Sequence, residues 1–362
     1  MTREEKKSAG DAWYASKGQD DDVVLSSRVR LARNLANFPF PASCDDDEAV
    51  RAQNIVFDAF NHFEDADAYQ SVPLAAVEPL GAKILSERGL FENNFGTGLV
   101  MRLDGISSCL VNCVDHVRVA SFAPGLALNA VYASSADIDS RLQERIQFAA
   151  SHDFGYLNAN VMDSGSGMKS SVRVHLPSIS YAGKIDEIMS LAAQKGFSVT
   201  APYGTGSRAG SSLGSIYQIS SVQSASGNEI DQLAAATAFA KNICETERKF
   251  RAEYADNKST PVRDMILRAF ATARFCMMMD LREAIDVVSA VKWGLDLGSV
   301  KGTKDWELSS LLYRIQSGHL GFLLKTGNFH FESDVVSDES LKEKRLRAIV
   351  MQDAFKKISF VI

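Results

Sequence analysis

Cysteine is scarce in this sequence, and the cysteines present are not spaced to bind zinc. The chain of 362 residues has five cysteines, and no two of them form the CxxC pair typical of a zinc site. An odd number of scattered cysteines in a chain of this size is typical of reduced thiols rather than of a disulfide framework. Long apolar runs are also missing, because no stretch approaches the roughly 20 residues that span a bilayer. We therefore expect no disulfide-dependent fold and no membrane partner.

The beginning of the chain and the balance of charge narrow the class of protein further. Residues 1–7 are polar and contain no apolar core, so no signal peptide is expected and the predicted location is cytoplasmic. The net charge is −6, from 39 basic and 45 acidic residues, which argues against a general nucleic-acid partner. A hydrophobic content of 46% is normal for a globular protein. A local basic pocket for phosphate remains compatible with these values.

The pattern of apolar residues divides the chain into three parts. Residues 1–22 are polar and predict a mobile N-terminal lead-in. Residues 23–255 contain most of the strand signals, and residues 256–362 read as a helical domain. The predicted strands lie within 98–122, as two strands with a turn at Asp104-Gly105, and at 171–176 and 216–219. The predicted helices lie within 48–70, 134–152 with Ser135 as its cap, 182–195, 261–276, 280–292, 304–315 and 338–357.

Two arginines lie two residues apart in the apolar, strand-like stretch at 23–35. Side chains alternate along a strand, so Arg28 and Arg30 share one face. Two arginines on one face suit a triphosphate, because each guanidinium offers planar, bidentate donors. Arg118, in a second strand-like stretch, is a third candidate. Spacing alone also allows the simpler interpretation, in which these are surface or salt-bridged arginines on strands.

Two glycine-rich segments are candidate anion-binding loops. Gly165 and Gly167 precede Lys169, and glycines let the backbone approach a phosphate closely. The segment is not a Walker A loop, because Met168 separates Gly167 from Lys169. Residues 203–214 are compatible with an anion-binding nest, a mobile lid or a solvated linker, and composition does not distinguish these.

Several segments in a fixed order resemble the ATP:guanidino phosphotransferases, and specifically the bacterial protein-arginine kinases. Residues 26–30 resemble that family's Ser-Ser-Arg-x-Arg segment, and residues 111–119 resemble its Asn-Glu-Glu-Asp-His-x-Arg loop. The resemblance covers most of the chain. The matching segments are 24–40, which includes the first motif, 154–157, 172–177, 203–207, 214–220 and, in the C-terminal helical domain of the bacterial kinases, 293–298.

The resemblance implies a fold, a cofactor and a set of phosphate-binding residues. The implied fold is α+β, with a curved antiparallel sheet flanked by helices, as in guanidino kinases and glutamine synthetase, followed by a helical domain that supports homodimers in the relatives. The implied cofactor is ATP with Mg²⁺. The residues that match phosphate-binding positions are Arg28, Arg30, Arg118 and Lys169, where Lys169 replaces an arginine of the family.

The same resemblance exposes losses on the substrate side. Cys113 and Val114 stand where the family has two glutamates. A guanidinium stays protonated at neutral pH, so a positioned carboxylate must hold it and accept its proton. Asp115 and Asp163 are the possible replacements. In the second loop, Thr205 and Arg208 occupy positions that are acidic in the bacterial kinases. The phosphoarginine pocket of those kinases survives only in part, with Arg347 matching and the two residues that begin its motif lost.

Two functional hypotheses follow, and the enzyme assignment depends on the missing glutamates. The first is a protein-arginine kinase that transfers the γ-phosphate of ATP to arginine side chains of proteins. The second is an inactive pseudokinase that binds nucleotide or a regulatory protein partner. The resemblance implies a zinc-containing activator and a Clp-type unfoldase as partners. An ATPase without acceptor, or a kinase for a small guanidino compound, is a third possibility.

Overall fold

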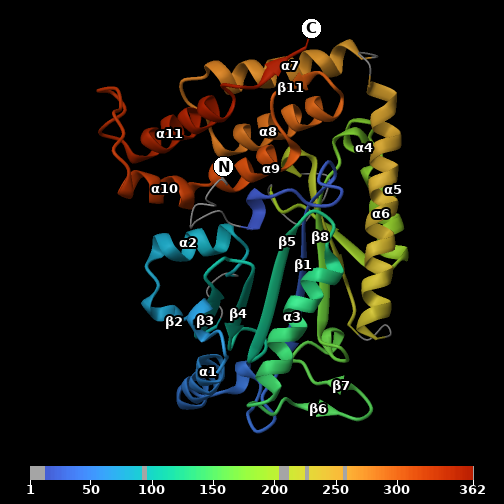
Figure 1. Ribbon diagram of the computed structural model, residues 1–362, viewed down its shortest axis with the longest axis vertical. Coiled ribbons are helices and arrows are strands. Elements are labelled where there is room, and N and C mark those ends of the chain that lie inside the picture. Colours follow the sequence, from blue (N-terminus) through green and yellow to red (C-terminus); the bar gives the residue numbers. More distant parts are fainter. Residues whose placement is uncertain (1–12, 92–95, 204–211, 225–227, 256–258, 362) are drawn as a thin grey trace, which may run out of the picture.

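An eight-stranded antiparallel sheet organises the N-terminal two thirds of the molecule (Figure 1). The computed structural model describes residues 13–91, 96–203, 212–224, 228–255 and 259–361. Neighbouring strands of the sheet pair in an antiparallel manner throughout. In spatial order the strands are β2 (Tyr69–Pro73), β3 (Gly98–Arg102), β4 (Ser107–Val111), β5 (Val117–Pro124), β1 (Val24–Arg33), β8 (Met168–His175), β10 (Ile216–Ser221) and β9 (Phe197–Thr200).

Helices cover the sheet and form a separate group beyond one of its ends. Figure 1 shows the C-terminal helices gathered at the top of the view, above the strands. The predicted α+β architecture is therefore confirmed. The helices beside the sheet are α1 (Asp46–Asn61), α2 (Pro79–Glu87), α3 (Leu128–Gln143), α4 (Pro177–Tyr181), α5 (Ile185–Gln194) and α6 (Glu229–Tyr254). The C-terminal helices are α7 (Thr260–Phe275), α8 (Leu281–Asp296), α9 (Asp305–Arg314), α10 (Ser317–Thr326) and α11 (Glu339–Ala354).

Short elements complete the described structure. They are the 3-10 helices η1 (Trp13–Ala15), η2 (Pro41–Ser43), η3 (Ala66–Ala68), η4 (Leu74–Ala76), η5 (Val161–Asp163) and η7 (Leu213–Ser215), and the two-residue strands β6 (Ala150–Ser151), β7 (Gly155–Tyr156), β11 (Val300–Lys301) and β12 (Ser359–Phe360). No helix in the described ranges is long and apolar enough to cross a membrane.

The alternation seen in the sequence decides which face of the sheet is buried. Val29 and Leu31 of β1 and Val172 of β8 point to the face that packs on α3, α5 and α6, where they join Val131 and Phe239 in one hydrophobic cluster. Each fully buried aliphatic side chain of this kind contributes about 1.5–3 kcal/mol through the hydrophobic effect. Because side chains alternate, the arginines between these positions point to the opposite face.

The hairpin prediction was right about its first turn and wrong about the number of strands. Residues 98–122 form three strands rather than two, because a second turn at 112–116 separates β4 from β5. Asn112 begins this turn with a left-handed backbone, at φ 51°. Asparagine tolerates that conformation better than most residues. The amide of Asn112 donates to the carbonyl of His116 at 3.0 Å, which closes the turn.

Some predicted helix limits were also wrong. The helix predicted over 134–152 begins at Leu128 and ends at Gln143. Ser135 is buried in its interior and donates to the carbonyl of Val29 at 3.4 Å, so it joins α3 to β1 instead of capping the helix. The helix predicted over 48–70 ends at Asn61. The apolar residues after it, including Phe63 and Tyr69, pack against Phe60 as part of a different cluster.

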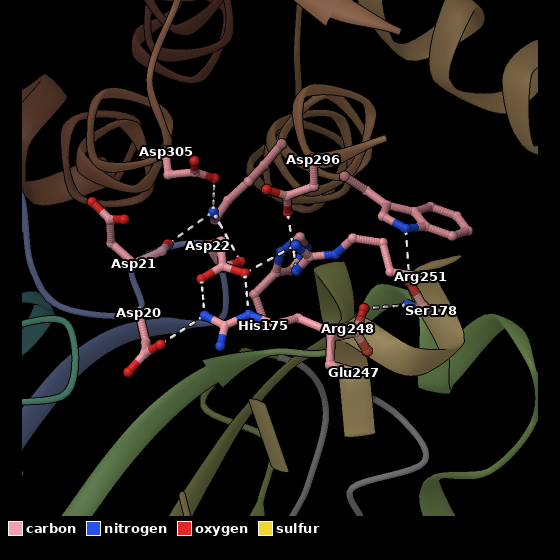
Figure 2. A network of polar contacts seen from close by, with 12 residues as sticks. Asp20, Asp21, Asp22, His175, Ser178, Glu247, Arg248, Arg251, Asp296 and Asp305 are labelled. Carbon is pink, nitrogen blue, oxygen red and sulfur yellow. Dashed lines mark hydrogen bonds and ion pairs between the residues drawn. The ribbon is translucent and has the colours of Figure 1, made fainter. Parts of the chain in front are cut away.

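The described part of the predicted lead-in packs against the rest of the molecule. Trp13 is buried, and its ring stacks on Phe122 of β5 with centroids 5.5 Å apart. Asp22 accepts hydrogen bonds from Arg248 and Arg251 of α6, each at 2.9 Å (Figure 2). Residues 13–22 thus belong to the folded structure, and the polar composition of this segment reflects ion pairing.

The same network joins the sheet-containing part to the C-terminal helices (Figure 2). Lys292 of α8 is 2% exposed and contacts the carboxylate of Asp305. Its ammonium group also donates to the carbonyls of Asp21 and Asp22, at 3.0 and 3.2 Å. Arg251 lies 3.4 Å from the carboxylate of Asp296. Charged contacts therefore cross the division predicted near residue 256.

Candidate phosphate-binding site

The strand register brings the four predicted phosphate ligands to one face of the sheet. Arg30 on β1 lies opposite Lys169 on β8, and Ala32 lies opposite Arg118 on β5. Arg28 lies opposite Ser171, and its Nε donates to the hydroxyl of Ser171 at 3.3 Å. Directly paired residues share a face, so these cations lie together although they come from three strands. A face with this charge suits a polyphosphate.

Arg173 is a fifth cation on this face, and it was not among the residues predicted from the sequence. It follows Lys169 and Ser171 at alternate positions of β8 and lies opposite Ser26 and Gln218. The signal was available, because Arg173 lies between Val172 and Val174 in the predicted strand at 171–176, and side chains alternate along a strand. What the sequence could not show is that β1 and β8 pair in the register that places Arg173 beside Arg28.

The environment of Arg173 leaves part of its guanidinium without a hydrogen-bond partner. Its Nη1 lies 3.4 Å from the hydroxyl of Tyr203, whose pKa is raised by burial to about 12 and which therefore stays neutral. The Nε of Arg173 is buried and makes no hydrogen bond within the described residues. Arg173, Arg28 and Gln218 line a small cavity of about 30 Å³. A buried, unsatisfied donor of this kind is costly unless a ligand or water completes it.

The turn at 112–116 presents no free carboxylate to this face. The side chain of Val114 is 48% exposed, and the Sγ of Cys113 accepts from Nη1 of Arg118 at 3.7 Å. Asp115 is 2% exposed and accepts from Nδ2 of Asn34 at 2.6 Å and from the amide of Ala159 at 2.9 Å. Those bonds hold the loops together and occupy Asp115, so its geometry is that of a structural residue.

Asp163 is placed differently from Asp115. It ends η5, and its carboxylate lies 2.7 Å from the ammonium group of Lys169. Since Lys169 lies opposite Arg30, Asp163 is a carboxylate at the edge of the cationic face. Of the two predicted replacements for the lost glutamates, Asp163 is the one that the structure brings to the predicted phosphate ligands.

Arg347 lies in the C-terminal helices and not with the other cations. It is 1% exposed, and it donates to the carbonyls of Ile315 at 2.9 Å and Met279 at 3.1 Å. It also contacts the carboxylate of Glu343, one turn earlier on α11. These contacts use Arg347 to hold neighbouring segments together. Thr205 and Arg208, the positions expected in the second loop, lie outside the described residues.

The residues present fit the phosphates of ATP better than they fit a protein-bound metal. Five cations share one face, as a polyphosphate requires. Across the described ranges no cluster of three or more histidine, cysteine or acidic side chains is arranged to hold a metal ion. Magnesium that accompanies ATP commonly has phosphate oxygens and water among its ligands.

This sheet, with cations from three strands on one face and helices on the other, has the fold of the guanidino-kinase class. Residues 51–250 match the family model described as the ATP:guanido phosphotransferase C-terminal catalytic domain. Residues 259–359 match the model described as the protein-arginine kinase McsB C-terminal domain. The chain belongs to the ATP:guanido phosphotransferase family and has the two-part organisation of its protein-arginine kinase branch.

Individual relatives agree with the family models. The chain is 30% identical to the protein-arginine kinase of Halothermothrix orenii over 339 residues, which is 92% of this chain and 95% of that protein. It is 31% identical to the protein-arginine kinase of Bacillus velezensis, over 85% of this chain and 86% of the relative.

Solved structures with low sequence identity share the fold. The crystal structure of lombricine kinase superposes with a TM-score of 0.56 at 18% identity, covering 67% of this chain and 71% of that one. The duplicated taurocyamine kinase from Schistosoma mansoni gives a TM-score of 0.58 at 20% identity, covering 77% of this chain and 41% of that one.

Proposed function

We propose that this protein binds Mg-ATP on its cationic face and has lost most or all arginine-kinase activity, so that it serves as a nucleotide-binding regulatory member of the family. The observation that carries this proposal is the turn at 112–116. There Arg118 contacts the sulfur of Cys113. The buried carboxylate of Asp115 accepts hydrogen bonds from the side chain of Asn34 and from the amide of Ala159. Phosphates have cations to bind, whereas an arginine acceptor finds no free carboxylate at this turn.

The physical cost of the missing carboxylates is large. Phosphoryl transfer depends on positioning the acceptor and on neutralising the charge of the transferred group. Loss of a positioned acid–base group typically slows a reaction by about 10²- to 10⁴-fold. The cationic face can neutralise the charge of the transferred group, through Arg28, Arg30, Arg118 and Lys169. These residues do not position the acceptor. Cations for the phosphates without a carboxylate to position the acceptor support nucleotide binding without turnover.

Titration calorimetry with Mg-ATP tests the binding half of the proposal. We expect one site in the wild-type protein and at least a tenfold loss of affinity in Arg28→Ala/Arg30→Ala, because each charged hydrogen bond contributes about 1.5–3 kcal/mol. Arg268→Ala is the matched control, since Arg268 is exposed on α7 and pairs only with Asp264 in the described structure. Equal affinity in all three proteins would show that ATP does not bind at this face.

A second candidate function is an active protein-arginine kinase with a relocated base, and Asp163 is the observation that favours it. The carboxylate lies beside Lys169 and therefore near the phosphates that Lys169 is proposed to hold. In this alternative Asp163 holds the acceptor guanidinium and receives its proton. Asp163→Asn would then abolish phosphoarginine formation while ATP affinity stays within a fewfold of wild type.

A further inference from the structure

A polar cleft lies where the beginning of the chain meets the C-terminal helices, and the proposed ATP chemistry does not use it. Its volume is about 590 Å³, within the range of small-molecule sites. One side of α9, from Trp306 to Arg314, and the residues at and just after the end of α11 form much of the wall. The residues that matter for its chemistry are Tyr14, Arg88, Trp306, Arg314, His319 and Lys357.

Three cations line this cleft without forming an ion pair. Arg88 follows α2, Arg314 ends α9 and Lys357 follows α11. Within the part of the chain that the structure describes, none of the three has a carboxylate oxygen within ion-pair distance. Three cations that line one cavity can all attract an anion bound between them.

Nearby carboxylates are engaged elsewhere and do not neutralise the cleft. Glu87, next to Arg88, accepts from the amide of Gly318 at 2.7 and 3.0 Å. Glu307, the one acidic residue in the described lining, accepts from the hydroxyl of Thr303 at 2.9 Å and from the amide of Lys304 at 3.0 Å. The latter bond caps the beginning of α9. These carboxylates have structural tasks that leave the three cations available.

Asp353 is a third nearby carboxylate. It lies near Arg314 but pairs with Lys356 at 2.7 Å.

His319 and two aromatic rings give the cleft chemical features beyond charge. Burial and the charges of Arg314 and Arg88 lower the pKa of His319, so its imidazole is neutral at pH 7 and offers one donor and one acceptor. The rings of Trp306 and Tyr14 add flat apolar surface. Cations beside aromatic rings suit a ligand with an anionic end and an organic body.

We propose that this cleft binds a small organic phosphate, with Arg88, Arg314 and Lys357 around the phosphate and Trp306 against the organic part. The site is distinct from the cationic face of the sheet, although the two are neighbours. Arg88 lines both cavities, and the stacked rings of Tyr14 and Tyr313, with centroids 4.1 Å apart, contribute one ring to each. A ligand in the cleft therefore contacts the wall of the proposed nucleotide site.

Phenyl phosphate is a suitable probe, because it has a dianionic group and one ring. The titration uses full-length protein carrying Arg28→Ala/Arg30→Ala, so that binding at the sheet does not contribute. We expect one binding site, and at least tenfold weaker binding after Arg314→Glu/Lys357→Glu is added. Inorganic phosphate is expected to bind more weakly than phenyl phosphate, because it lacks the ring that contacts Trp306.

Lys195→Glu/Lys249→Glu is the matched control for net charge. Both lysines are exposed and lie outside the lining of the cleft, at the end of α5 and on α6. Binding should be unchanged in this control, and circular dichroism should show that each variant is folded. If Arg314→Glu/Lys357→Glu does not fold, Arg314→Gln takes its place, and a smaller loss of affinity for phenyl phosphate is expected. No binding by the parent protein, or equal losses in the cleft and control variants, would overturn the proposal.

Discussion

At the scale of single residues, the proposal rests on the charges of the cationic face and of the turn at 112–116. The register of three strands gathers Arg28, Arg30 and Arg118 with Lys169 on one face. Cys113 and Val114 stand at the two positions where the family resemblance predicts glutamates. Asp115, in the same turn, does not take the place of these glutamates, because its carboxylate already accepts hydrogen bonds from Asn34 and Ala159.

The first prediction concerns restoration of these carboxylates. Cys113→Glu/Val114→Glu should raise phosphoarginine formation by at least 10²-fold over the wild-type background, because a positioned carboxylate contributes about 10²- to 10⁴-fold. Cys113→Gln/Val114→Gln is the control, since it matches the size of glutamate without the charge. Formation of phosphoarginine is followed by mass spectrometry at neutral pH. The same rate in both double variants would show that the lost glutamates do not limit catalysis.

At the scale of elements, the network around Asp22 attaches the N-terminal segment to α6. Burial alone would raise the pKa of Asp22, but hydrogen bonds and charges from Arg248 and Arg251 outweigh it and lower the pKa to about 2. A carboxyl group with a lowered pKa in the folded state stabilises the protein above its unfolded pKa, near 3.8. That stabilisation is lost as the pH falls from about 4 towards 2.

The second prediction follows from this pKa. Asp22→Asn should reduce the free energy of unfolding at pH 7 by about 1–2 kcal/mol, with partial exposure of the pair already taken into account. The difference from wild type should shrink as the pH falls from about 4 to 2. Urea titrations across this range measure it. Asp264→Asn, in an exposed pair with Arg268, should have little effect. A difference that does not change with pH would contradict the assignment.

Features of the helices and strands that depend on neighbouring residues in the sequence could be predicted. Features that depend on distant residues could not. Alternation in β1 and β8 correctly separated Arg28 and Arg30 from the core residues beside them. The pairing of those strands joins residues about 140 positions apart, so Arg173 could not be placed beside Arg28 from spacing. The left-handed Asn112 split one predicted strand into two.

Tertiary contacts explain the other differences between sequence and structure. The sequence predicted a mobile lead-in up to residue 22, because the partners of residues 20–22 lie more than 200 positions away, at Arg248, Arg251 and Lys292. Arg347 was selected only because it matched part of a ligand-pocket motif, and the sequence did not show that it donates to the carbonyls of Ile315 and Met279. In each case the sequence showed the charge and only the fold showed its partner.

At the scale of the whole molecule, buried charge links the sheet-containing part to the C-terminal helices. Burial raises the pKa of Asp296 to about 8, although Lys292 and Arg251 act in the opposite direction. A carboxyl group whose pKa is raised on folding binds a proton more tightly in the folded state. It therefore lowers stability progressively as the pH rises from about 4 to about 8.

The third prediction tests this junction. Asp296→Asn removes the titrating group while it keeps the shape of the side chain. The stability of the variant relative to wild type should increase between pH 4 and pH 8, by on the order of 2 kcal/mol. Denaturant unfolding at several pH values measures the difference. A relative stability that falls over this interval would mean that the ion pair with Arg251 outweighs burial.

The most direct test of the account is to measure nucleotide binding and phosphoarginine formation in the same preparation. The protein is incubated with Mg-ATP and an arginine-rich protein substrate, and the products are analysed by mass spectrometry at neutral pH. We expect ATP to bind and the wild-type protein to form no more phosphoarginine than Arg118→Ala. A time-dependent arginine phosphate that is absent in Arg118→Ala would contradict the account and would identify an active kinase with a relocated base.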